Sequence, residues 1–204
     1  MTAELTLDDI LDTRAYERVR DRYRKRVIEH KRSRRVPLGP IMTLVFESAD
    51  TIRFQVQEMA RVEHIVTDEG IQSELDVYNR LLPTPGELSA TLFIELTSEP
   101  DLREWLPKLT GIERAIQFEL NWSDPVVSEP EPSHEAALTR ESVTPAVHYL
   151  RFSFTDAQVR ALAGGGAALV SRHPAYDARA ALSGSAISTL VAELEGTTSR
   201  VPID

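Results

Sequence analysis

The chain has 204 residues, a formal net charge of −9 and no cysteine. A chain of this length forms one domain, or one domain with a long insert, and buries enough surface to fold without a disulfide or a metal. The absence of cysteine excludes disulfides, thiol catalysis and cysteine-ligated zinc or iron–sulfur clusters. The sequence also lacks both glycine-rich phosphate-binding motifs, G-x-G-x-x-G and G-x-x-x-x-G-K-[ST].

The charge is unevenly distributed along the chain. Residues 1–13 carry four acids and no base, residues 14–35 carry eleven bases against three acids, and residues 36–204 carry twelve bases against twenty-five acids. The middle segment therefore has a balance of +8 on an otherwise anionic chain. We expect it to pack on acidic surface, within the chain or across a dimer, and an acidic protein partner or a nucleic acid is the alternative. The candidate anion- or partner-binding residues are Lys31, Arg32, Arg34 and Arg35, with Lys25 and Arg26 on the helix before them.

The N-terminal segment is acidic and has no continuous apolar stretch, so we expect no standard signal peptide. No run approaches 18 apolar residues, so we expect no membrane-spanning segment. A cytoplasmic location is the expectation that follows.

The N-terminal part of the chain is predicted to consist of helices with one β-hairpin between them. Tyr16, Val19, Tyr23 and Val27 recur at helical spacing and make one narrow apolar seam on a basic helix, which the turn-forming run 36–40 ends. The predicted elements are a short helix starting at Thr6, a helix over 15–32, hairpin strands over 41–47 and 51–55, and helices over 57–66 and 67–82.

The remainder of the chain alternates strands and helices. Thr155 and Gln158 form a capping-box pattern, and alternation along 147–154 places His148 on the more apolar face of a strand. The segment 121–146 carries four prolines and five acids against one base, which predicts an exposed loop. The predicted elements are strands over 88–96, 112–120, 147–154, 167–171 and 176–182, a helix from Ser98 to Gly111, a short helix from Thr155 to Gly164, and a closing helix with Ile187, Leu190, Val191 and Leu194.

Together these elements predict the α+β class, with N-terminal helices, a mainly antiparallel β-sheet packed by helices, and a C-terminal β-hairpin and helix. We expect a single domain over 1–204, with a basic helix over 14–35 and an acidic, proline-rich loop insert over 121–146.

The chain resembles the domain of unknown function 3501 family, and the ordered set of matching segments covers most of its length. The resemblance brings no established activity with it. It implies an accessory role in a redox or peroxide-defence module beside rubrerythrin-like and iron–sulfur proteins, which are often encoded next to members of the family. The matching segments are 36–40, 54–63, 74–79, Ala90-Thr91 with Glu95, 147–152, and His173-Pro174 with Tyr176.

Two groups of polar residues are candidates for binding a ligand or a metal. Glu58, Arg61 and Glu63 follow one another on a predicted helix, where Glu58 and Arg61 are neighbours that can pair. His148 and His173 lie on or beside predicted strands, and with the glutamates they would offer nitrogen and oxygen ligands if the fold brought them together. We favour an ion-pair network for the helix residues, a satisfied core histidine at 148 and a turn residue at 173, with the ligand or metal role as the alternative.

The sequence contains no self-sufficient catalytic motif, so we favour a non-catalytic accessory or interaction protein, homo-oligomeric and with a redox protein as partner. A metal- or small-ligand-dependent enzyme is the alternative, in which case the candidate residues above would form its site. Nucleic-acid binding through the basic helix is a second alternative, and the anionic remainder of the chain argues against it.

Overall fold

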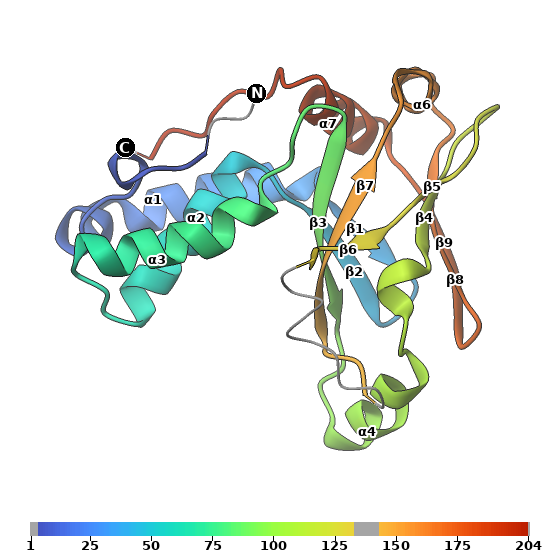
Figure 1. Ribbon diagram of the computed structural model, residues 1–204, viewed down its shortest axis with the longest axis horizontal. Helices are drawn as coiled ribbons and strands as arrows, with labels where there is room; N and C mark the ends of the chain where they lie inside the picture. Colours follow the sequence, from blue (N-terminus) through green and yellow to red (C-terminus); the bar gives the residue numbers. More distant parts are fainter. Residues whose placement is uncertain (1–3, 133–142, 204) are drawn as a thin grey trace.

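The predicted α+β class is confirmed by a computed structural model, which describes residues 4–132 and 143–203. A layer of helices lies at one end of the molecule and a pair of antiparallel sheets at the other (Figure 1). Residues 133–142 of the predicted loop insert lie outside the described part of the chain.

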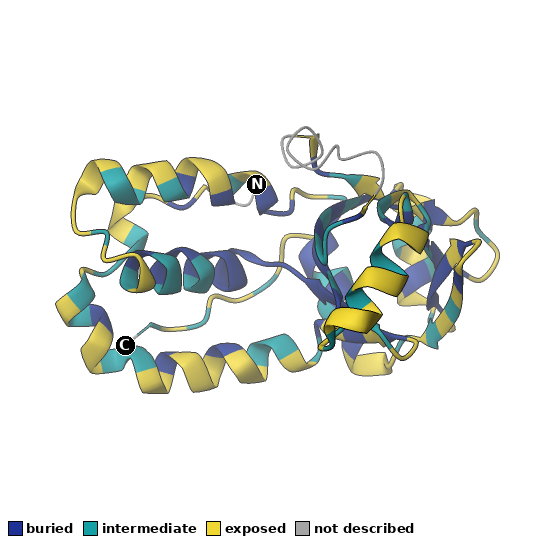
Figure 2. Cartoon of the chain, turned by 90° about the horizontal axis from the view of Figure 1, so that it is seen from below, coloured by how far each residue is buried: buried dark blue, intermediate teal, exposed yellow. Residues whose placement is uncertain are grey.

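The N-terminal helices form a layer that we call the helical arm. Polar caps begin its helices: the Asp12 side chain accepts a hydrogen bond from the Ala15 N–H, and the Ser48 and Thr67 side chains accept equivalent bonds. The helix α2 lies between α1 and α3 and is the most buried of the three (Figure 2). The elements of the arm are η1 (Leu7–Asp9), α1 (Thr13–Arg32), α2 (Ala49–Val62), α3 (Asp68–Tyr78) and η2 (Asn79–Leu81).

Two antiparallel sheets enclose the main hydrophobic core. One has the strand order β1-β2-β3-β7-β6 and the other β5-β4-β8-β9. Phe118 of the second sheet packs against Phe152 of the first with ring centroids 5.0 Å apart, and Phe46 and Phe154 join them. The strands are β1 (Arg35–Leu38), β2 (Met42–Phe46), β3 (Glu87–Ile94), β4 (Ile116–Glu119), β5 (Val126–Val127), β6 (Glu129–Pro130), β7 (Val147–Ser153), β8 (Ala168–His173) and β9 (Tyr176–Ala181).

The remaining helices cover the ends of the sheets. As predicted, Thr155 caps a short helix with Gln158, and the chain closes with a β-hairpin, β8–β9, followed by a helix. These elements are α4 (Glu99–Lys108), η3 (Ile112–Arg114), α6 (Asp156–Ala163) and α7 (Gly184–Leu194). After α7, residues 195–203 return to the helical arm, where Val201 and Ile203 pack against the buried seam of α1.

Four predicted elements differ from the structure. The described part of the predicted exposed loop 121–146 contains the short strands β5 and β6, and Val126 and Ser128 in it are buried. The second hairpin strand, 51–55, is wrong because Thr51 caps the first turn of α2 together with Ser48, and the helix continues through this segment. The segment 36–40 is not only a turn, since its first residues belong to β1 and Gly39 turns the chain into β2. The predicted strand 112–120 begins instead with the single helical turn of η3.

Candidate interaction surface

The helix α1 has one buried face and one cationic face. Tyr16, Tyr23 and Val27 are at most 1% exposed and form the narrow seam that the sequence predicts. On the opposite side lie four exposed bases, which the helical repeat of 3.6 residues places on one face. We call this surface the cationic face of α1. It consists of Arg14, Arg18, Arg22 and Lys25.

The cationic face is not neutralised by the part of the chain that the structure describes. None of its four bases forms an ion pair with a residue in 4–132 or 143–203. Asp21 and Glu29 are the acids of α1 nearest to this face, and Glu29 pairs with Arg32 at 2.8 Å. The surface therefore retains a net positive charge that is available to a partner.

Glu58 is held by α1 rather than by its own helix. Arg20 donates two hydrogen bonds to it, from Nε to Oε1 and from Nη2 to Oε2, both at 2.8 Å. The Tyr16 hydroxyl donates a third to Oε1 at 2.6 Å. The Arg20 guanidinium lowers the pKa of the Glu58 carboxyl, while burial and the adjacent carboxylate raise the pKa of the Tyr16 hydroxyl. These three hydrogen bonds all join α1 to α2.

The other two candidate residues of α2 do not join Glu58 in one cluster. The Arg61 guanidinium pairs with Glu17 of α1, with 2.5 Å between Nε and Oε1, so the predicted neighbours Glu58 and Arg61 each bind α1. Glu63 is exposed at the end of α2. Burial raises the pKa of Glu74 on α3, and the nearby charge of Glu63 raises it further.

The two candidate histidines lie in the sheets, away from the arm. His148 is 3% exposed, and its Nε2 is 3.0 Å from the Thr144 hydroxyl. His173 accepts a hydrogen bond at Nδ1 from the Ala175 N–H, so its Nε2 carries the proton that it donates to the Thr110 carbonyl at 3.0 Å. Both ring nitrogens of His173 are therefore occupied.

The structure does not bring the candidate ligands into one site. Glu58, Arg61 and Glu63 belong to the helical arm, whereas His148 and His173 lie on β7 and β8. Across residues 4–132 and 143–203, no three histidine, aspartate or glutamate side chains are arranged to hold a metal ion.

The four predicted anion-binding residues lie in four different environments. The Lys31 ammonium lies 5.7 Å from the centroid of the Phe54 ring, and Arg32 is exposed beside Glu29. Arg34 is fully buried, and Arg35 pairs with Glu95 at the surface. Arg14, Arg18 and Arg22 were not among the predicted residues, although their spacing of four residues places them on one helix face.

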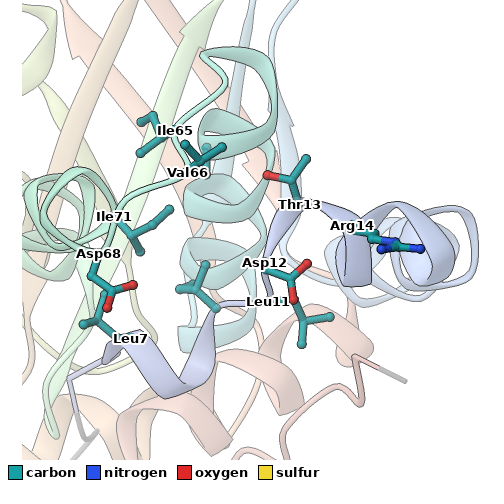
Figure 3. A pocket seen from close by; sticks show the side chains of 11 residues that line it. Leu7, Leu11, Asp12, Thr13, Arg14, Ile65, Val66, Asp68 and Ile71 are labelled. Carbon is teal, nitrogen blue, oxygen red and sulfur yellow. The ribbon is translucent and has the colours of Figure 1, made fainter.

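A cavity of about 360 Å³ opens beside the N-terminal end of α1 (Figure 3). Apolar side chains from η1, the η1–α1 connection, α2, the α2–α3 connection and α3 line most of it, and Asp12, Asp68 and Arg14 are its charged members. Arg14 belongs both to this lining and to the cationic face, so the two features adjoin. The apolar lining consists of Leu7, Ile10, Leu11, Ala60, Ile65, Val66 and Ile71.

The fold and its surfaces define an α+β protein with a charged helical arm. Its sequence matches the family described as "Protein of unknown function (DUF3501)" over residues 4–194, and the chain belongs to this family. A crystal structure of a novel protein of unknown function from Burkholderia pseudomallei K96243 is similar, with 36% sequence identity and a TM-score of 0.86 over 94% of this chain and 100% of that chain. No curated protein matches the chain. In the described part of the chain, no helix combines the length and apolar character needed to cross a bilayer.

Proposed function

We propose that the chain is a non-catalytic interaction protein that docks the acidic surface of a partner protein on the cationic face of α1. The observation that carries this proposal is the set of four exposed bases, Arg14, Arg18, Arg22 and Lys25, that no described residue neutralises. Surface charge of one sign on a defined face favours association with a surface of the opposite sign.

The rest of the arm supports a compact protein partner over nucleic acid. The acids Asp68, Glu69, Glu74 and Asp76 of α3 carry no compensating base on that helix. These acids, on the far side of α2, and the net charge of −9 on the chain repel a long polyanion more than a protein with a confined acidic patch. The apolar cavity next to Arg14 offers room for one apolar side chain of such a partner.

The partner that we propose is a redox protein of the rubrerythrin-like or iron–sulfur kind, with the chain itself acting as a homo-oligomer. The support for the redox partner is the family resemblance. Because the chain has no cysteine, it would act on an iron–sulfur partner through contact rather than by holding a cysteine-ligated cluster of its own.

A charge-reversal experiment tests the docking surface. We expect wild-type protein to bind purified rubrerythrin-like or iron–sulfur proteins at low salt, and Arg14→Glu, Arg18→Glu and Arg22→Glu together to weaken binding by about tenfold or more. Arg103→Glu, Lys108→Glu and Arg160→Glu together are the matched control, because they change the net charge by the same amount and all three bases are exposed on other helices, α4 and α6. Binding affinity is measured by calorimetry across a salt series.

Two results would contradict the proposal. One is equal weakening by the control, which would indicate an effect of total charge rather than of α1. The other is retention of the wild-type protein on random duplex or single-stranded DNA with no binding to the acidic proteins, which would favour the nucleic-acid alternative.

A further inference from the structure

The C-terminal segment is bound to the helical arm through its main chain. The Asp50 carboxylate accepts a hydrogen bond from the Val201 N–H at 2.9 Å, and the Arg53 guanidinium donates one to the Val201 carbonyl. Asp50 is 2% exposed and Arg53 is 8% exposed. Two buried, oppositely charged side chains thus bind the main-chain N–H and the carbonyl of one residue in an extended segment. This is how a peptide is held whatever its side chains are.

The two charged side chains are positioned by the arm itself. Arg53 also donates to Asp50 Oδ1 at 2.9 Å and, through Nε, to the Tyr23 hydroxyl at 3.0 Å. Its guanidinium carbon lies 5.4 Å from the centroid of the Tyr23 ring. These contacts do not involve the C-terminal segment, so the clamp formed by Asp50 and Arg53 is organised before the segment binds.

Selectivity comes from the side chains on either side of Pro202. Val201 and Ile203 pack against the cluster of Tyr16, Tyr23 and Val27. Arg26 donates a hydrogen bond from Nη1 to the Pro202 carbonyl at 3.1 Å. The site thus engages the carbonyl at position 202, and proline, which has no N–H, fits there without losing a main-chain bond. The chemistry that it recognises is apolar–proline–apolar in an extended conformation.

The connection to α7 makes the bound segment a separable element. Residues 195–200 are exposed except for the partly buried Thr198, and Gly196 turns the chain with φ = +67°. Segments with few buried contacts open at a lower free-energy cost than the core. An empty clamp would leave the buried Asp50 and Arg53 without their main-chain partners, which is costly. Exchange for another segment of the same chemistry is therefore favoured over simple opening.

We infer that the surface formed by Asp50 and Arg53 of α2 and the apolar seam of α1 is a peptide-binding site for an extended apolar–proline–apolar segment of a partner protein. Residues 199–203 occupy this site in the chain itself and can be displaced from it. The ligand must supply one N–H and one carbonyl to Asp50 and Arg53, and two alternating apolar side chains to the seam of α1. The inference does not rest on the cationic face, which lies on the other side of α1.

The test uses the full chain with residues 199–203 displaced from their binding site by two substitutions, and we call this protein the unseated variant. Val201→Asp and Ile203→Asp together place carboxylates against Asp50 and the apolar seam while leaving the residues of α1 and α2 unchanged. The probe is a fluorescent peptide with the sequence of residues 199–203. We expect the unseated variant to bind it at least about tenfold more tightly than wild type, whose own segment competes at a high effective concentration. Adding Asp50→Asn should abolish this gain, and a probe with aspartate at the Val201 position should not bind.

The outcomes separate the alternatives. An unseated variant that keeps its circular dichroism spectrum and melting temperature but binds the probe no better than wild type would overturn the inference. Loss of the fold on unseating would also overturn it, because the segment would then be a fixed part of the core. The wild-type protein could also form a dimer that dissociates when the segment is displaced. The natural ligand would then be the same segment of a second copy, and the inference of a segment from a different protein would be overturned.

Discussion

Arg34 and Glu193 form a buried ion pair across 159 residues of sequence, with 2.6 Å between Nη2 and Oε2. Their side chains are 0% and 6% exposed. Arg34 follows α1 and Glu193 lies on α7, so the pair joins the helical arm to the closing helix. Arg34 Nη1 also donates to the Glu47 carbonyl at 3.1 Å, at the point where β2 leads into α2.

Removing one member of this pair should strongly destabilise the protein. Glu193→Ala leaves a buried guanidinium without its counter-charge, and we expect a loss of about 3–5 kcal/mol in the free energy of unfolding. The control is Glu29→Ala, which breaks the exposed pair with Arg32 and should cost less than about 1 kcal/mol. Chemical denaturation measures both, and equal costs would contradict the structural role of Arg34.

Glu58→Gln should loosen the contact between α1 and α2. The substitution keeps an acceptor for Tyr16 but removes the charge that pairs with Arg20. Because both side chains of the pair are about a quarter exposed, the expected cost is about 1–2 kcal/mol. Glu63→Gln is the matched control on the same helix and should change the free energy of unfolding by less than about 0.5 kcal/mol. If the two variants denature at the same urea concentration, Glu58 does not hold the arm together.

His30 makes the stability of the protein depend on pH. Burial, and secondarily the charge of Arg34, lower the pKa of His30 from 6.5 to about 4. Between these values the unfolded chain binds a proton that the folded chain does not. The contribution of neutral His30 is therefore complete above pH 6.5 and is lost as the pH falls toward 4.

The size of this effect is obtained by difference. Wild type should lose as much as about 3 kcal/mol more than His30→Gln between pH 7 and pH 4, since each unit of pKa shift corresponds to about 1.4 kcal/mol. Denaturation curves of both proteins over this range provide the measurement. Parallel pH profiles would show that His30 titrates alike in the folded and unfolded states.

Gly39→Ala should destabilise the turn between β1 and β2. Gly39 has φ = +71°, and an added Cβ would collide with the Tyr176 hydroxyl. That hydroxyl donates to the Leu38 carbonyl at 2.7 Å, so it cannot withdraw without losing the bond. We expect a cost of about 2–3 kcal/mol from the backbone conformation and the displaced hydroxyl.

The control for Gly39 is Gly184→Ala at the start of α7. A Cβ there meets no atom within 4 Å, so the change should be neutral or slightly stabilising. Thermal denaturation distinguishes the two variants, and similar melting temperatures would contradict the proposed role of the Tyr176 contact.

The sequence predicted the elements whose local signals agreed with one another. For α1, the spacing of Tyr16, Tyr23 and Val27 was enough to place the buried seam. For α2, the β-branched and aromatic residues of 51–55 suggested a strand, but Ile52, Val56 and Ala60 recur at helical spacing and are all buried. The cap at Ser48 and the packing of α2 between α1 and α3 outweigh the local β propensity of this segment.

The environments of the charged residues were less predictable than the helices. Nothing local distinguishes the buried Arg34 from its exposed neighbour Arg35, because the difference arises from Glu193, far along the sequence. The histidines show the same limit. Alternation placed His148 on the buried face of β7, but its contact with Thr144 depends on how the preceding segment folds back.

The arrangement of the arm gives it an electric dipole across its width. The cationic face of α1 lies on one side of α2, and the acids of α3 lie on the other. In the field of an anionic partner, this dipole would experience a torque that turns the cationic face of α1 toward the partner before contact. Encounter complexes would then form already aligned, and their rate would fall steeply with ionic strength while the dissociation rate changed little.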